Sequence, residues 1–136
     1  MKKSWLRAAI AGLISALLTF TFSIASAADV PEGYHLIEGR WIVVGFPGGD
    51  LILYVDNLDN PTKGYLTKTG GNCAVSKQEV FPKKNDAGFA FDTYMYGTCR
   101  MSTFTFTGPD AEGKYGGTFA GAAGTSQISV QIQQKK

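Results

Sequence analysis

Few residues of this chain could do chemistry, and the first to consider is the only histidine, His35. A catalytic triad or a hydrolytic metal site needs a histidine placed with a nucleophile or with further ligands. His35 follows Tyr34 just before the first predicted strand, and nothing in the sequence pairs with it. We therefore expect an exposed polar residue here, no enzymatic activity and no cofactor.

Acidic and amide side chains gather in one turn-rich segment, residues 56–60, which contains Asp56, Asp59 and Asn60. Calcium binds about six to eight such oxygens. Asp and Asn also stabilise turns by bonding their own backbone, however. The glycine and distal glutamate of an EF-hand are missing, so we expect a turn and no metal.

Paired carboxylates could also hydrolyse glycosides. The remaining acidic residues considered for this role fall mostly at predicted turns, and the sequence shows no pairing among them: Asp50, Glu79, Asp86, Asp110 and Glu112.

Tyrosines form the strongest candidate binding residues. Tyr94 and Tyr96 share one face of a predicted strand with Asp92, and Tyr54 is expected to face outward from another strand. Exposed tyrosines anchor protein and sugar partners because they combine an apolar ring with a polar tip. The alternative is that they serve cross-strand packing on a sheet surface.

The N-terminus has the pattern of a cleavable secretory signal peptide. Lys2, Lys3 and Arg7 precede an apolar run over residues 8–24, and Ala25-Ser26-Ala27 gives the small-residue cleavage pattern. A transmembrane anchor would need about 20 apolar residues, and this run is shorter. The sequence therefore predicts a signal peptide over residues 1–27, no membrane anchor after cleavage, and a bacterial protein that is periplasmic or secreted.

Cleavage would leave a single domain, residues 28–136. It carries ten Lys or Arg against eleven Asp or Glu, a net charge of −1. Nucleic-acid binding needs a basic patch on the folded domain, so we expect no nucleic-acid partner.

The two cysteines, Cys73 and Cys99, both lie in this domain. An even number in an exported chain predicts a disulfide, which would add about 3 kcal/mol of stability in the chain-entropy model. Two cysteines without a neighbouring histidine would make a poor zinc site. We expect both cysteines at the same end of the fold, where loops converge.

Short β-branched and aromatic runs separated by Gly, Pro, Asn and Asp predict an all-β domain. Eight strands are expected, over residues 36–46, 51–56, 64–69, 73–81, 88–96, 99–107, 114–120 and 126–133. A turn is expected at Pro47-Gly48-Gly49. Short connections favour antiparallel neighbours, and a meander of eight strands can close on itself and remove exposed edges. The prediction is a small antiparallel eight-stranded meander barrel.

The interior of such a barrel is either filled by side chains or holds one small ligand. Alternation places Ile128, Val130 and Ile132 on one face of the last strand. Five phenylalanines would line or fill the interior, and we expect them to fill it: Phe89, Phe91, Phe104, Phe106 and Phe119.

Gly39-Arg40-Trp41 is a G-x-W at the start of the first predicted strand. With eight short antiparallel strands, it resembles the calycin group of small barrels: lipocalins, avidins and bacterial metalloprotease inhibitors. In those families the tryptophan closes one end of the barrel, so the resemblance implies this role for Trp41. Avidin-type biotin sites use several tryptophans, whereas Trp41 is the only one after the predicted signal peptide.

These features predict a non-enzymatic exported binding protein with a protein or carbohydrate partner. Inhibition of a secreted hydrolase is one concrete version. Two alternatives stay open: a lipocalin-like carrier of a small apolar ligand, and a structural or adhesive subunit of the envelope.

Overall fold

The computed structural model describes residues 30–43, 46–71, 74–94, 101–121 and 124–134. Within these ranges the chain is all β. The strands are β1 (His35–Val43), β2 (Phe46–Val55), β3 (Gly64–Lys68), β4 (Val75–Val80), β5 (Lys83–Lys84), β6 (Gly88–Thr93), β7 (Ser102–Thr107), β8 (Lys114–Gly121) and β9 (Gly124–Ile132). No helix in these ranges is long and apolar enough to cross a membrane. The predicted signal peptide, Cys73, Tyr96 and Cys99 lie outside the described residues.

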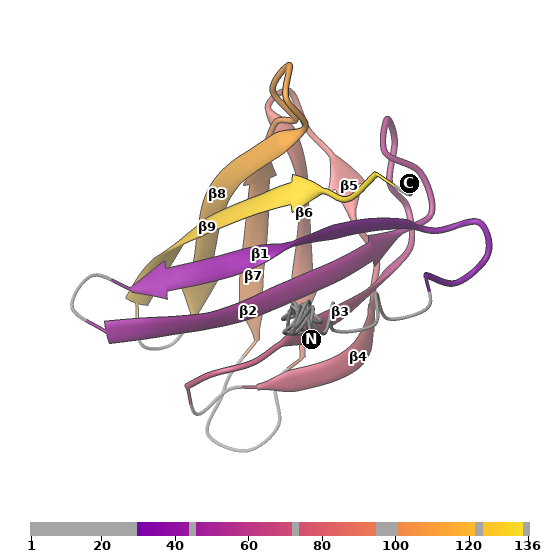
Figure 1. The fold of residues 1–136 in the computed structure, drawn as a ribbon. Coiled ribbons are helices and arrows are strands. Elements are labelled where there is room, and N and C mark those ends of the chain that lie inside the picture. Colours follow the sequence, from indigo (N-terminus) through magenta and orange to yellow (C-terminus); the bar gives the residue numbers. More distant parts are fainter. Residues whose placement is uncertain (1–29, 44–45, 72–73, 95–100, 122–123, 135–136) are drawn as a thin grey trace, which may run out of the picture.

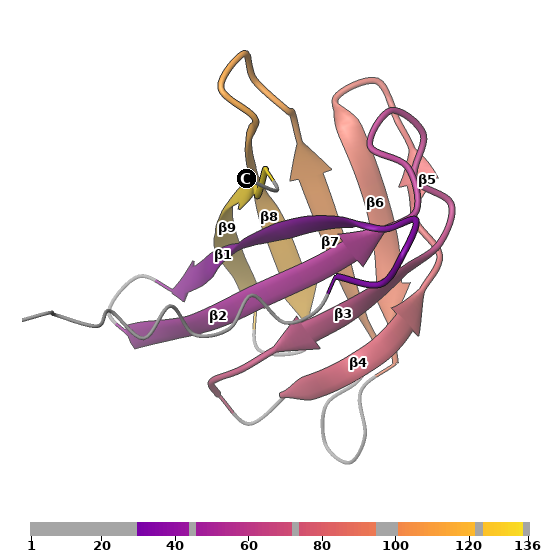
Figure 2. The same ribbon diagram turned by 45° about the vertical axis from the view of Figure 1, so that its right-hand side comes forward.

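The strands form one antiparallel sheet in the order β4-β3-β2-β1-β9-β8-β7-β6-β5. The first and last strands pair along most of β1, with Trp41 opposite Ile128. The sheet curls until β4 lies beside β6, as Figures 1 and 2 show from two sides. We call this junction between β4 and β6 the seam. The predicted all-β antiparallel fold is confirmed as a curled, barrel-like sheet.

The sequence did not predict β5, which brings the number of strands in the described residues to nine. Lys83 pairs with Ala90 and Lys84 with Phe89, in a stretch whose Pro82 and Asn85 favour a turn. Only Phe81 and Pro82 separate β4 from β5. The chain therefore passes directly from β4, at one end of the strand order, to β5, at the other end.

The turn predicted at Pro47-Gly48-Gly49 is wrong, because these residues lie inside β2. Gly49 pairs with Trp41 of β1. A Cβ at Gly49 would collide with the carbonyl oxygen of Thr69. The glycine therefore allows two backbone segments to approach closely. Besides turns, close backbone approach is a common reason for a glycine within a strand.

Stacked phenylalanine rings fill the interior. The ring centroids lie 4.8 Å apart for Phe89 and Phe106, 5.2 Å for Phe91 and Phe104, and 4.6 Å for Phe104 and Phe119. All five of these side chains are between 0 and 8% exposed. The prediction that they face inward is confirmed.

Trp41 lies near the end of β1, not at its start as predicted, because the strand already begins at His35. Its indole Nε1 donates a hydrogen bond to the carbonyl oxygen of Thr69 over 2.7 Å. The amine of the buried Lys68 lies 4.0 Å from the Trp41 ring centroid and 5.1 Å from that of Phe119. Trp41 and Lys68 thus occupy the interior at the end of the sheet where β1 and β3 finish.

Candidate binding surface at the seam

The seam is the one junction of the sheet where two strands meet without a ladder in the described part of the chain. β4 pairs with β3 alone. On its seam side, β6 pairs only through Phe89 and Ala90, with β5. The backbone groups of Asp92 therefore have no ladder partner on that side among the described residues. An unpaired edge of this kind can accept main-chain hydrogen bonds from another chain.

A side chain bridges the seam instead. The amide Nε2 of Gln78 in β4 donates a hydrogen bond to the carbonyl oxygen of Tyr94 over 2.6 Å. The other amide atom of Gln78, Oε1, is buried and has no hydrogen-bond partner within the described ranges. A buried acceptor without a partner costs about 1 to 3 kcal/mol, so the bridge is incomplete.

Three of the four large exposed apolar side chains in the described residues belong to the segments beside this bridge: Phe81 at 61% exposure, Tyr94 at 74% and Met101 at 59%. The fourth, Ile42 at 49%, lies on β1. Thr93 pairs with Ser102, so the next residues outward along the same hairpin, Tyr94 and Met101, oppose each other. Tyr94 follows the buried Thr93 and Met101 precedes the buried Ser102, so both share the outer face, because side chains alternate along strands.

Phe81 reaches the same face from the other side of the seam. Lys83 pairs with Ala90 of the antiparallel strand β6. If this register is extended by two residues, Phe81 lies opposite Asp92. The bond from Gln78 to Tyr94 confirms that β4 stays beside β6 beyond this level. We call the set Phe81, Asp92, Tyr94 and Met101 the seam surface.

Asp92 supplies the charge of the seam surface. It is exposed on β6 and pairs across the hairpin with Thr103 of β7. The Thr103 hydroxyl donates a hydrogen bond to Asp92 Oδ1 over 2.7 Å. This bond holds the carboxylate in one orientation, and Oδ2 has no intramolecular partner among the described residues.

The structure thus brings together two of the predicted binding residues, Asp92 and Tyr94. Tyr54 lies elsewhere, on the outer side of β2 between Leu36 of β1 and Tyr65 of β3. It is only 7% exposed, so it does not offer the open ring that was predicted. Trp41 is inside the sheet, and Tyr96 lies outside the described residues.

Sequence reasoning does not single out Phe81 and Met101. The signal for Phe81 is the proline that follows it, since a proline interrupts an edge ladder and can leave the preceding apolar side chain exposed. No comparable signal marks Met101, because its exposure depends on the register of the hairpin between β6 and β7.

The oxygen-rich segment between β2 and β3 is a self-bonded turn. Asn57 Oδ1 accepts hydrogen bonds from the backbone N–H groups of Asp59 and Asn60. Partial burial opposes ionisation of Asp56, but hydrogen bonds from Thr62 and Lys63 hold the pKa of its carboxyl below the usual value. Among the described residues no group of three or more His, Cys, Asp or Glu is arranged to hold a metal ion. His35 is exposed at the start of β1.

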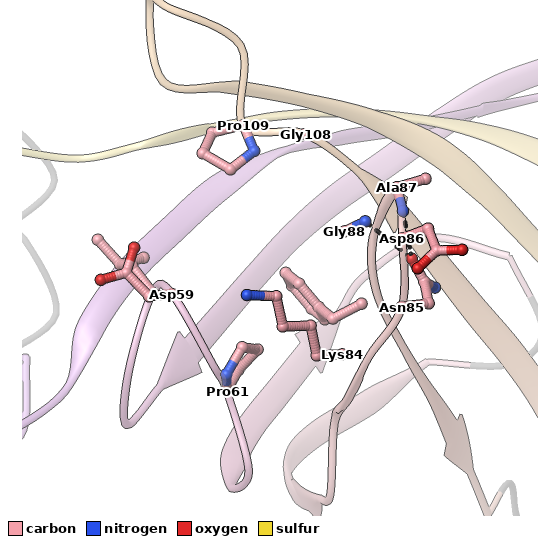
Figure 3. A pocket seen from close by; sticks show the side chains of 11 residues that line it. Asp59, Pro61, Lys84, Asn85, Asp86, Ala87, Gly88, Gly108 and Pro109 are labelled. Carbon is pink, nitrogen blue, oxygen red and sulfur yellow. Dashed lines mark hydrogen bonds between the residues drawn. The ribbon is translucent and has the colours of Figure 1, made fainter.

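A concave feature lies at the end of the sheet opposite Trp41. It is a recess of about 360 Å³ between the loops that join β2 to β3, β5 to β6 and β7 to β8 (Figure 3). Asp59, Lys84 and Asp86 line it together with apolar side chains. It contains none of the residues that the sequence predicted for binding.

Comparison with models of protein families, with curated proteins and with solved structures found no match for this chain. The account of its function therefore depends on its own geometry.

Proposed function

We propose that this protein is an exported, non-enzymatic binding protein that recognises a protein partner through the seam surface. The observation that carries the proposal is the gathering of Phe81, Tyr94 and Met101 beside an unladdered junction. Single exposed apolar residues are ordinary, whereas a cluster with a polar rim is typical of an interaction site. Aromatic residues and methionine are also enriched at protein interfaces.

A protein partner is favoured over a carbohydrate by two features of the seam. On the seam side of β6, Asp92 has no ladder partner among the described residues, and an extended peptide can pair with such an edge. Met101 adds an adaptable apolar contact that suits a protein surface. Inhibition of a secreted hydrolase is the concrete version that the resemblance to bacterial metalloprotease inhibitors suggests.

The carrier alternative has less support. The five stacked phenylalanines pack against one another in the interior, and a ligand could enter only by displacing them. Displacing even one such ring would cost packing energy. The loss of a buried phenylalanine side chain lowers the free energy of unfolding by about 3 to 5 kcal/mol. No contact among the described residues specifically favours a structural or adhesive role.

Export and a disulfide belong to the same proposal. β4 begins at Val75, shortly after Cys73, and β7 begins at Ser102, shortly after Cys99. The contact between Gln78 and Tyr94 brings these two strand ends to one end of the sheet. This supports a Cys73–Cys99 disulfide and an oxidising compartment, the periplasm or the medium.

The test is a pull-down from the periplasm and culture medium of the host with three forms of the exported protein. These are the wild type, the Phe81→Ser/Tyr94→Ser variant and the control Ile42→Ser. Ile42 is also exposed but lies on β1, far from the seam in the order of strands. We expect one protein to be captured by the wild type and the control, and lost from the seam variant. Equal capture by all three would overturn the proposal, as would binding confined to glycans.

A further inference from the structure

The recess opposite Trp41 has a fixed shape. The Gly108 N–H donates to the carbonyl oxygen of Ala87 over 2.8 Å, which ties the loop after β7 to the loop after β5. Asn85 Oδ1 accepts hydrogen bonds from the N–H groups of Ala87 and Gly88. A recess that is already formed loses little entropy when a ligand enters, which favours binding.

A cation crosses the recess between two carboxylates. Figure 3 shows Lys84 extended across it, with the amine directed toward the side where Asp59 lies and with Asp86 on the other side. The ion pairs of the described residues are Lys63–Glu79 and Lys114–Glu112. Lys84 and Asp59 therefore face the same space without being paired to each other, and each can bind a ligand group of opposite charge.

Part of the remaining wall is apolar, while Asn85 adds a polar side chain. Leu58 and Pro61 come from the loop after β2, Pro109 comes from the loop after β7, and Phe89 forms part of the floor. Small-molecule sites commonly combine apolar side chains with a few polar groups that fix orientation. They would accept the hydrocarbon part of a ligand whose charged groups meet Lys84 and Asp59.

A buried hydroxyl lies beneath this floor. The Tyr115 ring stands edge-on to the Phe89 ring with 5.8 Å between centroids. Its side chain is 2% exposed, and its hydroxyl has no hydrogen-bond partner within the described chain. Burial raises the pKa of the Tyr115 hydroxyl, and the charge of Asp59 raises it further. An unsatisfied polar group therefore lies within electrostatic range of the same carboxylate.

We propose that the recess binds a small zwitterion with an apolar side chain, the class of free apolar amino acids. Lys84 would bind the carboxylate, Asp59 the ammonium group, and the prolines and Phe89 the side chain. The volume of about 360 Å³ is near the lower limit of ligand sites, which begin at about 300 Å³, and suits a ligand of this size. The site is separate from the seam surface, so either proposal can fail alone.

The test is calorimetric and NMR titration of the full chain with three probes. Leucine is the zwitterion, leucinamide carries only the positive charge, and N-acetyl-leucine carries only the negative charge. We expect leucine to bind about tenfold more tightly than either probe, because each lacks one charge-assisted hydrogen bond. Resonances of residues 58–61 and 84–89 should shift.

Variants assign the two charges. Lys84→Met should remove the advantage of leucine over leucinamide, and Asp59→Asn its advantage over N-acetyl-leucine. Lys83→Met and Asp50→Asn, both at exposed positions outside the recess lining, are the matched controls and should bind leucine like the wild type. The proposal is overturned if leucine binds no better than the singly charged probes, if it shifts no resonance of the recess, or if the controls weaken binding as much as the recess variants.

Discussion

Gln78 and Tyr94 join the two ends of the sheet through a single side-chain hydrogen bond of 2.6 Å. Elsewhere neighbouring strands of the described residues are paired by backbone ladders, so this bond marks the least reinforced junction between them. The same junction carries three of the four large exposed apolar side chains in the described residues. Weak closure and an apolar surface therefore coincide, and this coincidence is the basis of the proposed binding role.

The first prediction concerns the bridge itself. Gln78→Ala removes the bond to Tyr94 and also the orphaned Oε1, so the two effects on stability oppose each other. We expect the free energy of unfolding to fall by less than about 1 kcal/mol, while hydrogen exchange of residues 75–80 becomes clearly faster. Gln127→Ala, at an exposed position of β9, is the control. Unchanged exchange in β4 would show that Gln78 does not close the seam.

The second prediction contrasts two phenylalanines. Phe104 is 0% exposed and Phe81 is 61% exposed. Phe104→Ala should lower the free energy of unfolding by about 3 to 5 kcal/mol through loss of burial and a residual cavity. Phe81→Ala should change it by no more than about 0.5 kcal/mol, as for an exposed position. Denaturant titration measures both, and similar losses for the two variants would be incompatible with a surface role for Phe81.

The third prediction is a pH dependence caused by Lys68. Burial lowers the pKa of its amine below 10.5, so between the folded-state pKa and 10.5 the unfolded chain binds more protons than the folded protein. The stability contributed by this residue must therefore rise with pH across that window. At lower pH the penalty for burying the charge is present in full, offset by the contact with the Trp41 ring.

Lys68→Met isolates this effect, because tyrosine ionisation is common to both proteins and cancels in the difference. We expect the stability of the wild type relative to Lys68→Met to increase as the pH is raised from neutral toward 10.5. Urea titrations at several pH values give this difference. A constant or falling difference would contradict the assignment of Lys68 as a buried amine.

The fourth prediction concerns the cysteines. If Cys73 and Cys99 form a disulfide, the exported protein should resist thiol alkylation until it is reduced, as read by mass spectrometry. Cys73→Ser/Cys99→Ser should then lose about 3 kcal/mol of stability. Rapid alkylation of both cysteines in the native, unreduced protein would rule the disulfide out and weaken the argument for export.

Local patterning was sufficient to predict most of the fold. Alternation in β9 predicts that Ile128 and Val130 are buried, and they are 4% and 3% exposed. β5 could not be predicted in this way, because its two residues, Lys83 and Lys84, show no alternation of apolar and polar side chains. They form a strand only because they pair with Ala90 and Phe89 of β6. The position of Gly49 inside β2 likewise depends on the close approach of Thr69, the residue after β3, which no local pattern contains.

The candidate site was predicted only in part, for the same reason. Asp92 and Tyr94 are recognisable from alternation within one strand. Phe81 and Met101 join them through the register of neighbouring strands, which is a long-range property. Tyr54 follows the same outward alternation but becomes buried between Leu36 and Tyr65 on the neighbouring strands.

The most direct test of the proposed binding role is hydrogen exchange on the complex with the captured partner. We expect new protection to be concentrated in residues 75–81, 91–94 and 101–104, on both sides of the seam. Protection confined to β1 and β2, or to the loops around the recess, would contradict the account.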